Sequence, residues 1–195
     1  MSERYDVVIA TPGEKFDQHY VWSITQTIKY LEQNNISWIW LNDYSSHVGE
    51  VRQRLVDLVM DLSYNKLFWI DSDIYWNVEQ FMKLYNSDYE IISGCYITTA
   101  GMVAAQNFDG SLIHPTALTF YDEIEEVQSC GFGFVCMKSG VIESVSDPMT
   151  PYEGNLNEDI SFCLRAKKEK GIPTMLDTSV RLDHFRTMSL GWGVV

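Results

Sequence analysis

Residues 67–76, LFWIDSDIYW, place four apolar residues directly before two acids, Asp71 and Asp73, with Ser72 between them. A short apolar run of this kind predicts a strand that is buried on both faces of a sheet. The acids then lie at the carboxyl end of the strand, the edge at which open α/β sheets bind ligands. Two carboxylates there can present oxygen ligands to a divalent cation, which would hold a diphosphate. The same residues also fit acids that merely end a strand.

The chain before this stretch alternates strand and helix patterns. An apolar run at residues 5–11 ends in Pro12-Gly13, which predicts a buried strand that runs into a loop. Apolar residues then recur at helical spacing over residues 20–31, until Asn34-Asn35. A second strand is predicted at residues 36–41 and a second helix at residues 48–62. Strands that alternate with helices favour a right-handed parallel α/β sheet.

The chain after the acids changes character. A short helix is predicted at residues 78–84 and a strand at residues 90–93. Residues 95–121 are rich in Thr, Gly, Ala and aromatic residues, which predicts hairpin or loop segments around Gly101 and Asp109-Gly110. We therefore interpret residues 1–94 as a nucleotide-binding half and residues 95–195 as an acceptor-binding half of a single domain, residues 1–195.

Residues 126–137, EVQSCGFGFVCM, hold two glycines in an apolar, strand-like context. Glycine there would let the backbone approach a ligand closely, and a bulge or tight bend is the alternative. The segment lacks the third glycine of a dinucleotide fingerprint and does not open a helix. Gly131 is therefore a candidate for ligand contact, but not through a dinucleotide-binding motif.

The last helix is predicted from Asn157, which would cap it, to the end signals Gly171 and Pro173. Glu158 and Asp159 open this helix, where acids also complement the helix dipole. Short strands are predicted at residues 174–176 and 180–182, and they bring His184 to the end of the ordered core.

Composition bounds the function. A chain of 195 residues with 46% hydrophobic content is long enough for one domain with a full core. The net charge of −13 removes the broad positive field that non-specific nucleic-acid or anionic-membrane binding would use. The four cysteines lack metal-binding spacing, so we expect buried reduced thiols and a cytoplasmic protein. No segment has the length and apolarity of a membrane span or an export signal.

The order of these features is more specific than any one of them. A TP loop, an NDYSS turn, the WIDSD strand end, the GFGF segment, the NEDISFCLRAKKEKG helix and a late LDH follow one another over residues 7–184. In this order the chain resembles the GT-A glycosyltransferases, especially the small stand-alone ones of bacteriophage and other viral genomes. The resemblance implies a single-domain GT-A fold, a Rossmann-like α/β/α sandwich whose mainly parallel sheet carries a smaller mixed portion on the acceptor side.

The resemblance also implies roles for individual residues. A manganese or magnesium ion would grip the diphosphate of a nucleotide-sugar, a UDP-sugar in the first instance, and an acid of the last helix would act as the base of an inverting transfer. The metal ligands would be Asp71, Asp73 and His184, and the catalytic acid pair Glu158 and Asp159. The nucleotide-sugar would contact Thr11, Pro12, Asn42, Asp43, Ser45, Arg52, Asp71, Ser72 and Gly131.

Elementary chemistry agrees with these roles, because a bound divalent ion stabilises a leaving diphosphate as a Lewis acid. A lone histidine such as His184 is also compatible with a purely structural place. Two rival functions stay open. A sugar-nucleotidyltransferase would usually carry a glycine- and lysine-bearing loop after the first strand, and a catalytically silent nucleotide- or glycan-binding module could keep the same fold. The acceptor is open as well, between a hydroxymethylpyrimidine in phage DNA and a glycan.

Overall fold

The apolar run before the two acids forms the middle of the central sheet. In the computed structural model, which describes residues 4–118, 123–151 and 156–185, β3 (Ser63–Ile70) pairs in parallel with β1 (Arg4–Pro12). β2 (Trp38–Asp43) lies on the other side of β1, with Thr11 opposite Asn42 and Pro12 opposite Asp43. The side chains from Leu67 to Ile70 are fully buried, as the apolar run predicts for a strand covered on both faces.

The seven strands of the sheet follow the order β2-β1-β3-β9-β5-β10-β7. β5 (Ile91–Cys95) and β10 (Thr174–Arg181) run parallel to each other, while β9 (Phe134–Lys138) and β7 (Ile124–Val127) run antiparallel to their neighbours. The sheet is therefore mostly parallel and mixed in its second half. β9 lies between β3 and β5 and runs antiparallel to β3. Phe134, the first residue of β9, therefore lies opposite Ile70, the last residue of β3, at the edge of the sheet where β3 ends.

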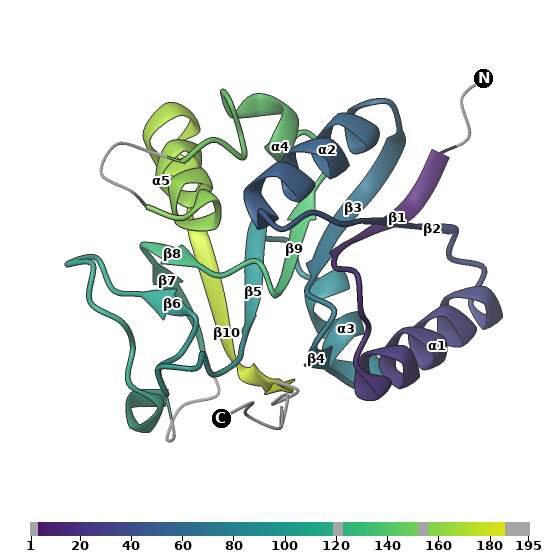
Figure 1. The fold of residues 1–195 in the computed structure, drawn as a ribbon, viewed down its shortest axis with the longest axis horizontal. Coiled ribbons are helices and arrows are strands. Elements are labelled where there is room, and N and C mark those ends of the chain that lie inside the picture. The colour runs from purple at the N-terminus through teal and green to yellow at the C-terminus, as the bar shows by residue number, and fades with distance from the viewer. Residues whose placement is uncertain (1–3, 119–122, 152–155, 186–195) are drawn as a thin grey trace, which may run out of the picture.

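Helices cover both faces of this sheet (Figure 1). α1 (Gln18–Gln33) and α3 (Val78–Tyr85) pack on one face, against the cluster that contains Phe68 and Ile70. α2 (Val48–Met60), α4 (Val141–Ser144) and α5 (Glu158–Lys170) pack on the other, against the cluster that contains Leu67 and Trp69. Alternate residues of β3 thus feed opposite cores, which is the period of two that a strand imposes. The result is the predicted α/β/α sandwich.

Two small antiparallel pairs lie outside the central sheet. β4 (Ile74–Tyr75), which directly follows the two acids, pairs with β11 (Asp183–His184). β6 (Ala105–Gln106) pairs with β8 (Ser129–Cys130), and a 3₁₀ helix, η1 (Pro115–Leu118), lies between them in sequence. The first pair brings His184 beside the acids, and the second forms a short hairpin-like unit on the side of α5 (Figure 1).

The predicted elements of the first half are confirmed, with shifts of a few residues at their ends. Three expectations for the second half need correction. Residues 126–137 do not form one strand but contribute to β7, β8 and β9, and residues 174–182 form the single strand β10 with a register shift after Asp177. Asn157 does hold the N-cap position of α5, but its side chain makes no capping hydrogen bond. Local pattern could not reveal how these strands divide, because the division depends on partner strands distant in sequence.

The end signals and the cysteines behave as predicted. Asn35 adopts a left-handed backbone conformation just after α1, and Gly171 does the same at the end of α5. The four cysteines are buried free thiols. No helix in the described part of the chain combines the length and the apolarity that a bilayer crossing needs.

Candidate active site

The two acids and the late histidine line one hollow at the strand-end edge of the sheet. We call this hollow, of about 350 Å³, the strand-end pocket; its lining includes Asp71, Ser72, Asp73 and His184. The chain fixes the turn that carries the acids through backbone hydrogen bonds. The Asp71 N–H donates to the Gly133 carbonyl at 3.0 Å, and the Phe185 N–H donates to the Asp73 carbonyl at 2.8 Å.

His184 is held by two hydrogen-bonding partners. Its Nδ1 lies 2.9 Å from the Ile97 carbonyl oxygen, and its Nε2 lies 3.2 Å from Asp73 Oδ2. A carbonyl can only accept, so Nδ1 carries a proton. In the neutral ring Nε2 then carries no proton, and its lone pair faces the Asp73 carboxylate. Because both groups are acceptors, this arrangement needs either a second proton on the ring or a cation between the two groups. The contact with Asp73 accordingly raises the pKa of His184.

Arg52, from α2, is the buried cation of the site, with 4% of its side chain exposed. Its Nη2 donates to Asp71 Oδ1 at 2.8 Å, and its Nη1 donates to Glu158 Oε1. The guanidinium carbon lies 5.6 Å from the centre of the Phe132 ring. Burial would lower the pKa of Arg52, but Asp71, Asp159 and Glu158 raise it further, so the guanidinium stays charged. Arg52 therefore links the end of β3 to the start of α5 and is not turned into any of the pockets described here.

Negative charge exceeds positive charge at this edge. Asp71, Asp73, Glu158 and Asp159 face one guanidinium and one imidazole. Burial raises the pKa of Asp71, and Asp73 adds to the rise, against the opposing effect of Arg52. Within residues 4–118, 123–151 and 156–185, no three His, Cys, Asp or Glu side chains are gathered closely enough to form a preformed metal centre. Asp71, Asp73 and His184 nevertheless share the wall of one pocket.

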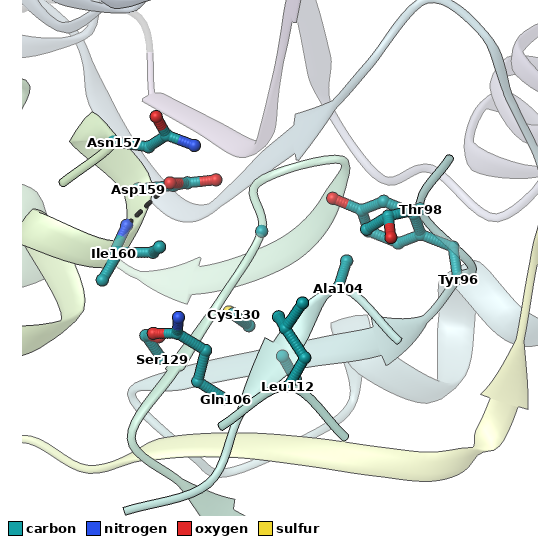
Figure 2. Close-up of a pocket in the computed structure, with 12 residues that line it drawn as sticks. Tyr96, Thr98, Ala104, Gln106, Leu112, Ser129, Cys130, Asn157, Asp159 and Ile160 are labelled. Carbon is teal, nitrogen blue, oxygen red and sulfur yellow. Dashed lines mark hydrogen bonds between the residues drawn. The ribbon is translucent and has the colours of Figure 1, made fainter. Parts of the chain in front are cut away.

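A second hollow, of about 170 Å³, adjoins the first. Figure 2 shows the side chains that line it. We call it the hairpin pocket, because β6 and β8 supply one of its walls and the start of α5 supplies another. Tyr96 and Thr98 line both pockets and so form a shared wall between them. The lining residues are Tyr96, Thr98, Ala104, Ala105, Gln106, Leu112, Ser129, Cys130, Gly131, Asn157, Asp159 and Ile160.

The two acids that open α5 face different surroundings. Asp159 lines the hairpin pocket, where its Oδ1 accepts a hydrogen bond from the Ile160 N–H at 2.7 Å and its carboxylate is directed into the hollow (Figure 2). Glu158 is buried against Arg52 and lines a different hollow, near the N-terminus of α2. Burial raises the pKa of Asp159, Arg52 opposes this, and Glu158 adds to it. The place of Asp159 in the first turn of α5 favours a charged carboxylate through the helix dipole, whereas desolvation acts against the charge and raises the pKa.

Tyr96 explains the two glycines of the GFGF segment. Its hydroxyl accepts a hydrogen bond from the Gly133 N–H at 3.0 Å. A Cβ on Gly131 would overlap the Tyr96 hydroxyl, and a Cβ on Gly133 would lie 2.6 Å from Tyr96 Cζ. The glycines therefore admit a side chain of the protein itself, which neither of the sequence-based interpretations had identified. Burial, together with Asp71, raises the pKa of Tyr96, so its hydroxyl keeps a proton to donate.

The other predicted contacts fall into two groups. Pro12 and Ser72 line the strand-end pocket, and Gly131 lines the hairpin pocket. The polar atoms of the remaining residues form hydrogen bonds or ion pairs within the protein. The buried Thr11 hydroxyl is hydrogen-bonded to Tyr20 and Trp40, and Asn42 Nδ2 donates to the Thr11 and Gly13 carbonyls. Asp43 pairs with Arg54, and Ser45 Oγ donates to Glu50. These residues shape the loops beside the strand-end pocket.

Several residues of the site carried no signal in the sequence. Tyr96 and Thr98 follow β5, Gln106 belongs to β6, and Ser129 belongs to β8. Each comes from the part of the chain that lacks helical or strand periodicity. The position of Tyr96 and Thr98 just past a predicted strand, Glu90 to Ser93, was the single available signal, because the ends of parallel strands share the ligand-binding edge.

The fold is similar to those of known transferases. Protein A197 from STIV, a viral protein, superposes with a TM-score of 0.62 and 20% identity over 93% of this chain and 86% of that one. GalNAc-T7, in a structure with UDP, GalNAc and Mn²⁺, gives a TM-score of 0.63 and 8% identity over 95% of this chain, which spans 44% of that protein. The catalytic domain of Drosophila beta1,4galactosyltransferase 7, in a complex with xylobiose, gives a TM-score of 0.54 and 12% identity over 94% of this chain and 71% of that one.

No protein-family model matches the sequence, and no curated protein matches it significantly. At these identities the structural likeness shows the fold alone. The chain has a GT-A-like α/β fold with a seven-stranded, mostly parallel central sheet, as the sequence predicted.

Proposed function

We propose that this protein is a metal-dependent glycosyltransferase that moves a sugar from a nucleotide-sugar, a UDP-sugar in the first instance, to an acceptor hydroxyl. One observation carries the proposal. A pocket lined by Asp71, Asp73 and His184 shares a wall with a pocket lined by the carboxylate of Asp159. Transfer needs these two environments side by side, one for a diphosphate leaving group and one for a base beside the acceptor.

The residues of the strand-end pocket fit a divalent cation. Asp71 and Asp73 supply hard oxygen ligands, and the hydrogen bond from Nδ1 to the Ile97 carbonyl leaves His184 Nε2 as a lone-pair donor beside Asp73. Mixed oxygen and nitrogen ligands suit Mn²⁺, and substrate phosphates could complete the octahedron of Mg²⁺. When bound, the ion would supply Lewis-acid stabilisation of the leaving diphosphate.

Asp159 is the base of the proposed reaction. Its carboxylate takes the proton from the acceptor hydroxyl, whose oxygen forms a bond to the anomeric carbon while the bond from that carbon to the diphosphate oxygen breaks on the opposite face. This single displacement inverts the anomeric centre. A carboxylate whose pKa is raised by burial is a stronger base than an exposed one, provided that it is ionised.

Other residues would position the donor. Tyr96 can donate its retained proton to a phosphate or sugar oxygen at the wall between the pockets. Asn42, Asp43 and Ser45 would border the nucleoside, because β2 ends beside β1 at the same edge. Pro12 and Ser72 would meet the diphosphate, and Arg52 would act through Asp71. In this proposal residues 1–94 supply most of the donor site, with Tyr96 and His184 added from the second half, and residues 95–195 supply the acceptor site.

The rival functions differ in what they would do to a donor. A nucleotidyltransferase would form a sugar-nucleotide from a nucleoside triphosphate, whereas the loop after β1, TPGEKFDQ, offers one glycine and one lysine for a triphosphate. A silent binding module would hold a nucleotide-sugar without cleaving it.

The deciding experiment measures release of nucleoside diphosphate from a panel of nucleotide-sugars. We expect hydrolysis that Mn²⁺ stimulates and that Asp73→Ala lowers by about 10²-fold or more, since the lost Lewis acid supplies several kcal/mol. Asp57→Ala, which removes an exposed acid of α2 outside the site, is the matched control and should retain activity. Tight donor binding without hydrolysis would indicate the silent module, and pyrophosphate release from a triphosphate would indicate the nucleotidyltransferase.

A further inference from the structure

The lining of the hairpin pocket is almost uncharged. Asp159 is the one acidic side chain among the twelve lining residues, and none of them is Lys, Arg or His. Leu112, Ile160 and Ala105 supply apolar surface, while amide and hydroxyl groups supply the remaining polar atoms. Such a mixture of apolar surface and a few convergent neutral polar groups is suited to an uncharged ligand that makes many hydrogen bonds.

Gln106 presents half of its amide to the hollow. Its Oε1 accepts a hydrogen bond from Ser129 Oγ at 2.8 Å, which fixes the orientation of the side chain. Among the described residues its Nε2 has no partner, and this nitrogen is turned away from Ser129 toward the interior of the pocket (Figure 2). An anchored amide with a free donor is a preorganised group for a ligand oxygen.

The Asn157 side chain is the second amide of the pocket. Asn157 stands at the N-cap position of α5, yet its side chain makes no capping hydrogen bond and has no other partner in the described part of the chain. Its amide lies above Asp159 on the same wall of the pocket (Figure 2). The amides of Asn157 and Gln106 and the carboxylate of Asp159 thus surround one small volume.

The described residues of the pocket offer little of what a DNA substrate would need. A flipped pyrimidine is held by stacking between flat side chains, but among the described residues of the lining Tyr96 alone is aromatic, and its ring packs against Gly131 and Gly133. The phosphates on either side of a flipped base require Lys or Arg. The lysines of α5 lie near its opposite end, about 12 to 16 Å from Asp159 along the helix axis.

We infer that the hairpin pocket is the acceptor subsite and that it takes a single neutral sugar ring, the terminal residue of a glycan. This rests on the proposed function. Amides can both donate to and accept from ring hydroxyls, and the apolar wall covers the C–H face of the ring. A volume of about 170 Å³ is small beside typical ligand pockets and is suited to one ring. Gln106 and Asn157 determine which hydroxyls are recognised, and Asp159 faces the hydroxyl that reacts.

The test measures acceptor binding without a donor. Saturation-transfer-difference NMR on the full chain would compare a panel of neutral methyl glycosides with a sulfated glycoside and with an oligonucleotide that contains 5-hydroxymethylcytosine. We expect binding of one or more neutral glycosides alone. Gln106→Ala and Asn157→Ala should each weaken this binding about 3- to 10-fold, the effect of one neutral hydrogen bond. Gln128→Ala is the matched control, since Gln128 follows β7 beside Gln106 but does not line the pocket.

The outcomes separate the two proposals. Binding of the oligonucleotide, absence of glycoside binding, or glycoside binding that both variants leave unchanged would overturn the acceptor inference. Asn157 is exposed, so its variant tests the pocket even if Gln106→Ala disturbs the β6–β8 pair. Failure of Mn²⁺-stimulated hydrolysis in the wild type, with glycoside binding intact, would instead overturn the proposed transfer and leave the saccharide site standing.

Discussion

The strand-end pocket and the hairpin pocket share a wall but are built in opposite ways. Long parallel strands end at the first, and it is charged, with Asp71, Asp73 and His184 on its lining. Two-residue strands and the start of α5 form the second, and its lining is neutral except for Asp159. A regular scaffold fixes the spacing of the charged groups, whereas the irregular segment sets the shape of the neutral pocket, which in our proposal selects the acceptor.

The proposed difference in role between the two pockets can be tested at Asp159, where we expect the largest effect, a loss of kcat for transfer. Asp159→Asn keeps an oxygen to accept from the Ile160 N–H but removes the base. A positioned base typically contributes about 10²–10⁴-fold, so we expect kcat for transfer to fall by that factor while donor affinity and Mn²⁺ affinity stay nearly unchanged. Steady-state kinetics and donor titrations measure both. Loss of Mn²⁺ binding would make Asp159 part of the strand-end pocket, and retention of configuration in the product, read by NMR, would remove its role as the base of an inverting transfer.

Arg52 joins the end of β3 to the start of α5, and its removal should affect stability more than any other single change at this edge. Arg52→Met leaves Asp71 and Glu158 without their buried partner, which should cost about 3–5 kcal/mol in the free energy of unfolding. The matched control is Arg54→Met. Arg54 pairs with Asp43 at the surface, where water and salt screen an ion pair and it contributes little to stability. Denaturant unfolding gives both values.

A second change sharpens the Arg52 result. Adding Glu158→Gln to Arg52→Met neutralises one of the two stranded carboxylates, so part of the stability should return. Equal losses for Arg52→Met and Arg54→Met, or no recovery in the double variant, would show that Arg52 does not link Asp71 and Glu158 energetically.

The sequence predicted the regular scaffold far better than the irregular one. The apolar run before Asp71 and the spacing of α1 and α2 were sufficient to place the parallel strands and the edge at which they end, because those signals are local. The use of Arg52 between Asp71 and Glu158 could not be read from the sequence, since the two carboxylates are 87 residues apart in the printed chain. The lining of the hairpin pocket was missed for the same reason: its members share no periodicity and meet only through β6, β8 and α5.

The glycines of the GFGF segment are a further case in which the sequence did not reveal the contact. Substitutions at the two glycines should also respond differently to removal of the Tyr96 hydroxyl. Gly131→Ala and Gly133→Ala should each destabilise the protein by about 1–3 kcal/mol, because a Cβ meets the ring or hydroxyl of Tyr96. In a Tyr96→Phe background the two should differ. A Cβ on Gly131 would lie 3.4 Å from the ring carbon once the hydroxyl is gone, whereas a Cβ on Gly133 would still lie 2.6 Å from it.

Double-mutant cycles on thermal or denaturant unfolding give the coupling in each pair. We expect Tyr96→Phe to relieve the effect of Gly131→Ala and to leave most of the effect of Gly133→Ala. No relief at Gly131 would mean that this glycine serves a bend of the backbone, as one interpretation of the sequence held, and not the packing of Tyr96.

The smallest expected effect concerns the free energy of unfolding, which is lower when the buried Asp159 carboxyl is ionised. Burial raises the pKa of Asp159 in the folded protein above the ordinary value of 3.8. Below that value the carboxyl is protonated in both states and contributes nothing. As the pH rises, the unfolded chain loses this proton first, so the folded state loses stability until the pH exceeds the raised pKa, and the loss is constant thereafter.

The side chain of the Asp159→Asn variant does not titrate at this position. The variant should therefore melt at a higher temperature than the wild type at pH 7, and the difference should narrow toward pH 4. Asp57→Asn, at an exposed position of α2, is the control and should show no such narrowing. A variant that melts below the wild type at pH 7 would mean that the attraction between Asp159 and Arg52 exceeds the desolvation of the carboxylate, and the base would then be held in place by the same cation that links the end of β3 to the start of α5.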